Sequence, residues 1–108
     1  MLANEANKKI FEWAMGGKVD PFNFRLMPDF TDPSPAFGLL DILVKRGYQP
    51  QLCYLYNDYA GKYLWFLDLY QENGFLYLKD PKGCTTKSAA ICEVICGLID
   101  LEAANERK

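Results

Sequence analysis

Apolar residues recur at helical spacing in three segments of the chain. The pattern predicts helices over residues 4–15, over residues 35–46, and from just after Thr85-Thr86 to about Ala103. Gly16-Gly17 ends the first segment, and Gly47 follows the second. Apolar residues cover well over half of the circumference of the second predicted helix, which indicates burial on more than one side.

Aromatic residues dominate the stretch between the second and third predicted helices, and turn signals divide it. The pattern predicts strands over residues 49–56, 62–71 and 75–79. Short turns such as "NDYAG" and "QENG" favour an antiparallel meander joined by hairpins. Both faces of the middle strand are apolar apart from Asp68. Such a strand is typical of a sheet that is covered on both sides, or covered once and met by a partner.

These elements predict an α+β fold: a three-stranded antiparallel meander packed between helices as a helix-sheet-helix sandwich. A fourth short strand around residues 22–26 is a candidate, because Pro21, Pro28 and Pro33 forbid a continuous helix there. The length of 108 residues fits one domain. Residues 1–33 supply its N-terminal helix and irregular segment, and residues 34–103 its helix-meander-helix core.

The charge balance argues against nucleic acid and membrane as partners. Twelve Lys and Arg residues stand against fourteen Asp and Glu, a net charge of -2, and the basic residues are scattered. No stripe of positive charge is therefore available to track a phosphate backbone. The chain has no secretory signal pattern and no apolar run of the roughly 20 residues that a membrane span needs. We expect a cytoplasmic protein whose four cysteines are thiols.

Groups that could carry out catalysis are sparse. The absence of histidine removes the usual general base near neutral pH. Cys84, Cys92 and Cys96 lack the paired spacing of a structural zinc site, and Cys92 fits the edge of an apolar helix stripe. Asp68 is unusual on its apolar strand, where an ion pair at a strand edge and a functional site are both open interpretations. We predict no enzymatic activity, no cofactor and no bound metal.

Aromatic side chains on the predicted sheet admit two interpretations. They can form a stacking platform for single-stranded RNA, or a sandwich core with an interaction surface. The acidic charge balance favours the second. The residues concerned are Tyr54, Tyr56, Tyr63, Trp65, Tyr70 and Tyr77.

The sequence "YNDYAGKY" concentrates three tyrosines and one acid in a turn and its shoulders. Tyrosine offers rigid contact area at low cost in side-chain entropy. An alternative, in which these tyrosines cover a helix end, stays open. The sequence thus predicts a protein-binding site formed by Tyr56, Asp58, Tyr59 and Tyr63.

The last predicted strand is short and flanked by turns, which is typical of a sheet edge. Phe75 and Tyr77 lie on this strand. They are the candidate residues of a dimer edge, and a homodimer is one assembly that the sequence allows.

Two segments resemble small bacteriophage-encoded proteins of the phage ABA sandwich domain family. "FTDPSPAFGLLDILVKRGYQPQL" matches that family at Thr31, Asp32, Ala36, Phe37, Arg46, Gly47 and Tyr48. "TTKSAAICEVICGL" is similar to its Thr-Ala-Pro-x-Ala-Ile-Cys helix start at Thr86, Ala90, Ile91 and Cys92. The chain departs from the family at Lys87-Ser88, where Ala-Pro is frequent, and in lacking a tryptophan-rich segment between the first two helices.

The resemblance implies a helix-sheet-helix layering and a phage or prophage origin, and it supplies no activity. Together with the missing catalytic groups, it leads us to expect an accessory protein that binds a host protein in the host cell cytoplasm. Inhibition of a host defence protein, as by an anti-CRISPR protein, is the leading hypothesis. The alternatives are a structural or homo-oligomeric phage accessory protein and a protein that sequesters a small ligand.

Overall fold

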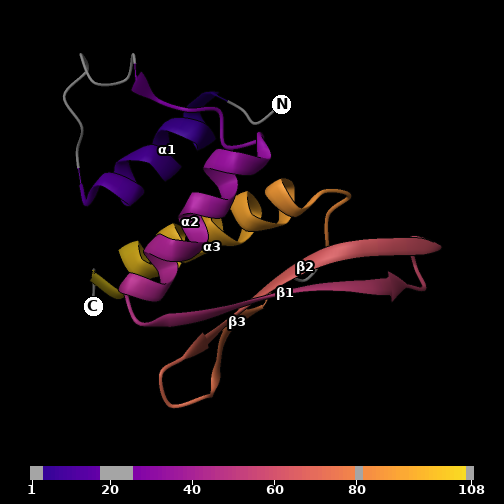
Figure 1. Ribbon diagram of the computed structural model, residues 1–108. Coiled ribbons are helices and arrows are strands. Elements are labelled where there is room, and N and C mark those ends of the chain that lie inside the picture. Colours follow the sequence, from indigo (N-terminus) through magenta and orange to yellow (C-terminus); the bar gives the residue numbers. More distant parts are fainter. Residues whose placement is uncertain (1–3, 18–25, 80–81, 107–108) are drawn as a thin grey trace.

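The computed structural model describes residues 4–17, 26–79 and 82–106. Three helices and three strands follow one another in this part of the chain (Figure 1). They are α1 (Asn4–Met15), α2 (Pro33–Lys45), β1 (Tyr48–Asn57), β2 (Lys62–Gln71), β3 (Leu76–Lys79) and α3 (Lys87–Glu106). The strands form one antiparallel sheet in the order β1-β2-β3. The α+β class and the three-stranded meander are therefore confirmed, while the candidate strand over residues 22–26 lies outside the described residues except for Leu26.

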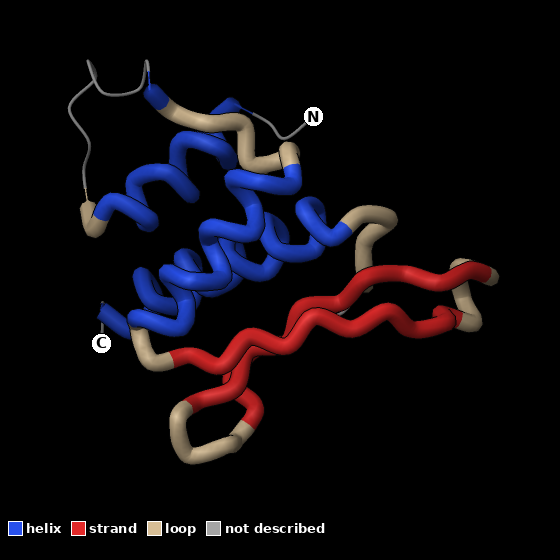
Figure 2. Tube along the Cα trace, in the orientation of Figure 1, coloured by secondary structure: helices blue, strands red, loops and turns tan. Residues whose placement is uncertain are grey.

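All three helices lie on the same side of the sheet (Figure 2). α2 packs on β1, α3 packs on β2 and β3, and α1 packs on α3 rather than on a strand. The layers are thus the sheet, then α2 with α3, then α1. The arrangement corrects one detail of our expectation, because the sequence and the family resemblance both implied helices on the two faces of the sheet.

Residues 82–84, which precede α3, cover part of the second apolar face of β2, at Leu64 and Phe66. Cys84 exchanges two backbone hydrogen bonds with Trp65, with N···O distances of 2.7 and 2.8 Å. Gly83 has a φ of +77° and lies so close that a Cβ there would be 2.7 Å from Cζ of Phe66 and 3.0 Å from Cβ of Leu64. A glycine-containing segment of the chain, and not a helix, therefore shields Leu64 and Phe66 from water.

α3 occupies the centre of the fold, with α1, α2, β2 and β3 all packed against it. Its first turn is capped by Thr86, whose Oγ1 accepts a hydrogen bond from the backbone N–H of Ala89 at 3.1 Å. Residues around most of the helix are buried, so α3 is an interior helix rather than an amphipathic surface one. The buried residues are Ser88, Ala90, Ile91, Cys92, Val94, Ile95 and Leu98.

A buried asparagine fixes the segment before α2 against α1. The side-chain amide of Asn7 donates to the carbonyl of Pro28 at 2.8 Å, and its Oδ1 accepts from the backbone N–H of Phe30 at 3.0 Å. The Sγ of Cys92 in α3 donates to the Phe30 carbonyl at 3.1 Å. The polar groups of this irregular segment are thereby satisfied inside the helical layer, as buried backbone requires.

Candidate functional site

The β1-β2 hairpin extends beyond the helical layer at its turn end (Figure 1). The two strands pair without interruption from Tyr48 opposite Gln71 to Asn57 opposite Lys62. Asn57 closes the turn: its carbonyl accepts from the N–H of Gly61 at 2.9 Å, and its Oδ1 accepts from the N–H of Ala60 at 2.9 Å. The hairpin is consequently a defined platform that projects from the body of the protein.

Four aromatic rings form a stacked row on the hairpin, which we call the aromatic ladder: Tyr54, Tyr56, Tyr63 and Trp65. The strand register places Tyr54 opposite Trp65, and their ring centroids are 4.6 Å apart. Tyr54 also stacks on Tyr63 at 5.2 Å, and Tyr56 meets Tyr63 edge-on at 5.3 Å. The three tyrosines remain 53 to 56% exposed although their rings are held in place by one another.

A cation joins the aromatic ladder to the helical layer. The Nζ of Lys87, at the start of α3, lies 4.7 Å from the centroid of Trp65. The same ammonium group lies 5.9 Å from the ring of Phe37 in α2, which is also exposed. Distances in this range give a cation-π attraction, so the positive charge is positioned beside the exposed rings.

The structure brings together two of the four residues in the predicted protein-binding site, Tyr56 and Tyr63. Asp58 and Tyr59 lie at the tip of the hairpin, where Tyr59 is fully exposed. Tyr59 therefore does not cover a helix end. Sequence reasoning did not include Lys87 in the site, because its approach to Trp65 depends on tertiary packing that no local pattern encodes.

The two candidate dimer-edge residues have different surroundings, although β3 does lie at an edge of the sheet. Phe75 directly precedes β3 and is 71% exposed. Tyr77 is half-buried against the core, 5.5 Å from the ring of Tyr48, and its hydroxyl accepts a 3.5 Å hydrogen bond from the side chain of Asn105. Of the two candidate residues, Phe75 is therefore the one whose side chain is exposed on this edge.

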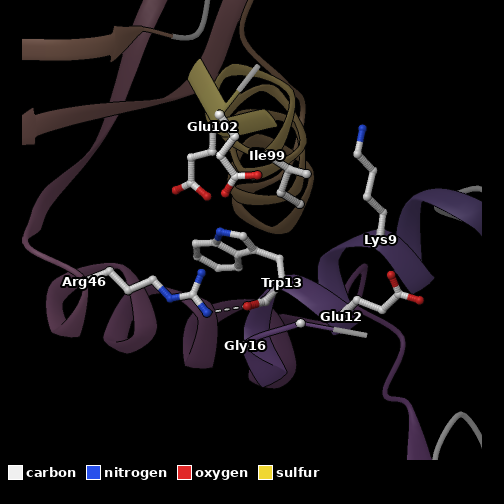
Figure 3. Close-up of a pocket in the computed structure, with 9 residues that line it drawn as sticks. Lys9, Glu12, Trp13, Gly16, Arg46, Ile99 and Glu102 are labelled. Atoms are coloured by element: carbon white, nitrogen blue, oxygen red, sulfur yellow. Dashed lines mark hydrogen bonds between the residues drawn. The ribbon is translucent and has the colours of Figure 1, made fainter. Parts of the chain in front are cut away.

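A second candidate site is a pocket of about 420 Å³ between α1, the end of α2 and the second half of α3 (Figure 3). The guanidinium carbon of Arg46 lies 4.2 Å from the centre of the Trp13 ring, and Arg46 Nη2 donates to the Trp13 carbonyl. Trp13 is only 8% exposed, yet its Nε1 has no hydrogen-bond partner among the described residues. This indole nitrogen faces Glu102 across the pocket.

Charges of both signs line the pocket: Lys9 and Arg46 with Glu12, Glu102 and Glu106. Lys9 forms an ion pair with Asp100. The hydroxyl of Tyr48 donates to Glu102 at 3.3 Å. Burial, together with the negative charge of Glu102, raises the pKa of Tyr48 to about 12. The pocket lining thus offers hydrogen-bond donors from Lys9 and Arg46 and acceptors from the three glutamates.

The cysteines do not converge on a metal-like site. Cys92 is buried in the apolar core, so it is a packing residue as the sequence predicted. The same burial raises the pKa of its thiol to about 12. The Sγ of Cys84 donates to Glu93 at 2.7 Å. Among the residues that the structure describes, no group of three Cys, Asp or Glu side chains is placed to hold a metal ion.

Asp68 is the other group that the sequence singled out. It lies opposite Gln51 on one side and Lys79 on the other, in the middle of the sheet. Its Oδ1 is buried and accepts no hydrogen bond from the described part of the chain. The register thus provides a cationic neighbour, Lys79, while Oδ1 of Asp68 has no hydrogen-bond partner among the described residues.

No helix within residues 4–17, 26–79 and 82–106 combines the length and the apolar character that crossing a membrane requires. Comparisons with protein-family models, with curated proteins and with solved structures gave no match. The fold and its surfaces define the protein as a small α+β protein with a projecting, aromatic hairpin.

Proposed function

We propose that the protein acts by binding another protein through the aromatic ladder and the hairpin tip. The observation that carries this proposal is the row of three tyrosines, each more than half exposed, whose rings are already fixed by stacking. Rings that are ordered before binding lose little entropy when a partner covers them. Aromatic side chains are also enriched among the residues that dominate binding energy.

The family resemblance supports a more specific version of this proposal. In that version the protein is a phage or prophage accessory protein, its partner is a host protein in the bacterial cytoplasm, and binding inhibits a defence function as an anti-CRISPR protein does. A structural role in a phage assembly is the competing version. The two differ in what the hairpin contacts, since an inhibitor needs a host protein and an assembly protein needs a phage one.

Affinity purification of the tagged protein from a bacterial lysate, followed by binding measurements on substituted proteins, tests the proposal. Tyr56→Ala and Tyr63→Ala each remove a ladder ring, and Tyr59→Ala removes the tip ring. We expect at least one of the two ladder variants to weaken the captured partner's affinity by roughly thirtyfold, which corresponds to about 2 kcal/mol. Phe75→Ala is the matched control, since it removes an exposed aromatic ring outside the β1-β2 hairpin.

Circular dichroism of each variant confirms that the fold is retained. A partner that binds all three tyrosine variants with unchanged affinity rules out the hairpin as the site. A host protein in the complex favours the inhibitor version, and a phage protein favours the structural one.

The pocket supports a second candidate function, the sequestration of a small ligand. The observation that favours this function is the buried Nε1 of Trp13, which has no hydrogen-bond partner among the described residues and faces a space lined by carboxylates. Buried polar groups are normally hydrogen-bonded, so a ligand acceptor would complete the site. Mass spectrometry of small molecules released by denaturing the purified protein tests this, with Glu102→Ala as the variant expected to lose the ligand.

A further inference from the structure

Within the part of the chain that the structure describes, no strand pairs with the outer edge of β1. β1 contains ten residues, lies at an edge of the sheet and carries no charged residue. It pairs with β2 without a bulge. Natural edge strands are usually short, charged or bulged, because an exposed row of backbone N–H and C=O groups pairs with other strands. The opposite edge, β3, follows that rule: it has four residues, a register shift and Lys79.

The hydrogen bonds of Trp65 show which backbone groups of β1 point outwards. Trp65 directs both its N–H and its C=O to Cys84, away from β1. Because backbone direction alternates along a strand, Leu64 and Phe66 direct theirs to β1. Their partners across the hairpin are Leu55 and Cys53, whose backbone N–H and C=O groups therefore bond to β2.

The residues of β1 between these positions must then direct their backbone groups away from β2. They are Leu52, Tyr54 and Tyr56, with Pro50 next in the same series. Pro50 lacks an N–H, and its ring obstructs a strand that approaches from that side. The part of the outer edge that can accept another strand thus runs from Leu52 to Tyr56.

We propose that a second copy of this chain pairs with this edge in an antiparallel, two-fold symmetric manner. Tyr54 lies opposite Tyr54 of the second copy, and Leu52 lies opposite Tyr56 of the second copy. This register is the symmetric one that uses the outward groups of all three residues and leaves both Pro50 rings outside the pairing. An uncharged strand is suited to meeting itself, because no like charges face each other across the axis.

The pairing also provides cover for exposed rings. Tyr54 is 53% exposed and would meet its own copy at a spacing at which cross-strand aromatic pairs stabilise a sheet. Both aromatic ladders would then lie on the same face of one continuous sheet, side by side. This inference goes beyond the proposed function, since it concerns the strand edge and needs no host partner. It also assigns the dimer contact to β1 rather than to the edge with Phe75 and Tyr77.

Sedimentation and light scattering of the purified chain across a concentration series provide the first test. We expect a particle of twice the chain mass of 12.4 kDa at high concentration. Tyr54→Lys sets two like charges opposite each other at the axis and should weaken the dimer by at least about tenfold. Leu55→Lys adds the same charge on the face of the sheet opposite Tyr54, at a residue whose backbone bonds to β2. This variant should keep the dimer affinity within about threefold of that of the unsubstituted chain.

Cross-linking provides a test of the register that does not depend on the lysine variants folding well. Opposed residues in a hydrogen-bonded antiparallel pair have Cα atoms about 5.5 Å apart, within the range of a disulfide. In a background with Cys53, Cys84 and Cys96 replaced by serine, Tyr54→Cys should form a covalent dimer under mild oxidation. Tyr63→Cys should not, because it lies on β2, one strand further from the axis.

Three results would overturn the inference. The first is a monomer at every concentration together with no cross-link through Tyr54→Cys. The second is a dimer that tolerates Tyr54→Lys but is broken by Phe75→Lys, which would place the contact at β3. The third is equal cross-linking from Tyr54→Cys and Tyr63→Cys. None of these results bears on whether the aromatic ladder binds a host protein.

Discussion

Substitution of Gly83 by alanine should destabilise the fold through a contact on the far face of the sheet. The new methyl group would lie 2.7 Å from Cζ and 2.9 Å from Cε1 of Phe66, and 3.0 Å from Cβ of Leu64. The Phe66 ring can move by a few tenths of an ångström, but Cβ of Leu64 is attached to a strand that is paired on both sides. The connection must therefore shift away from β2, and the cover over Leu64 and Phe66 loosens.

Two contributions set the magnitude. The left-handed backbone, with φ at +77°, costs alanine roughly 1 to 2 kcal/mol. About 0.4 to 1 kcal/mol of this cost is offset, because alanine lowers the conformational entropy of the unfolded chain. Overpacking of this kind costs about 1 to 3 kcal/mol. We expect the free energy of unfolding to fall by about 1 to 5 kcal/mol in total, a large share of the stability of a small domain.

Gly74→Ala separates the two contributions. Gly74 has a similar φ of +87°, and nothing lies within 4 Å of a Cβ placed there. Urea unfolding followed by tryptophan fluorescence gives both free energies, and their difference measures the packing contribution. Phe66→Leu should recover part of the loss in Gly83→Ala, because a shorter side chain vacates the space. If Gly83→Ala costs no more than Gly74→Ala, the close approach does not cover β2 as described.

Two further predictions concern hydrogen bonds elsewhere in the fold. Asn7→Ala should lower the free energy of unfolding by about 1 to 3 kcal/mol, because the carbonyl of Pro28 and the N–H of Phe30 lose their buried partner. Urea unfolding measures this loss. An unchanged unfolding midpoint would contradict the role assigned to Asn7. Above about pH 10 the unfolded chain releases the tyrosine proton first, because the pKa of Tyr48 is raised to about 12 in the fold. Stability should therefore fall as the pH rises from about 10 to 12, and Tyr48→Phe should reduce that slope. Equal slopes in the two proteins would refute the raised pKa of Tyr48.

Local patterns were sufficient to locate the helices and strands. The middle strand and α1 have the bounds that periodicity and glycine punctuation indicate. α3 continues to Glu106, past the expected end near Ala103, because neither glycine nor proline interrupts "ANE". β3 begins at Leu76 instead of Phe75, where a register shift between Leu69 and Tyr70 displaces the pairing. Such a shift depends on both strands and cannot be derived from either one.

Non-local contacts account for what the sequence did not reveal. The apolar character of both β2 faces indicates either cover on both sides or one cover and a partner, and it does not reveal that residues 82–84 lie over Leu64 and Phe66. The tyrosines of the hairpin were predictable from the sequence, because the length of the turn fixes the strand register and the register fixes which rings meet. The position of Lys87 over Trp65, and of Arg46 over Trp13, depends on how helices dock on the sheet. Sequence therefore located one part of the candidate site and missed the charges beside it.

The central position of α3 has a consequence for how the chain is made. Every other element except β1 packs against this helix, and it follows all of them in the chain. Domains fold during synthesis only when the segments that complete their core have emerged from the ribosome. Until α3 emerges, the apolar faces of α1, α2 and β2 have no interior helix to cover them. The nascent chain is thus exposed to aggregation until α3 has emerged, and a transcript truncated before the codon for Lys87 would yield a product without its interior helix.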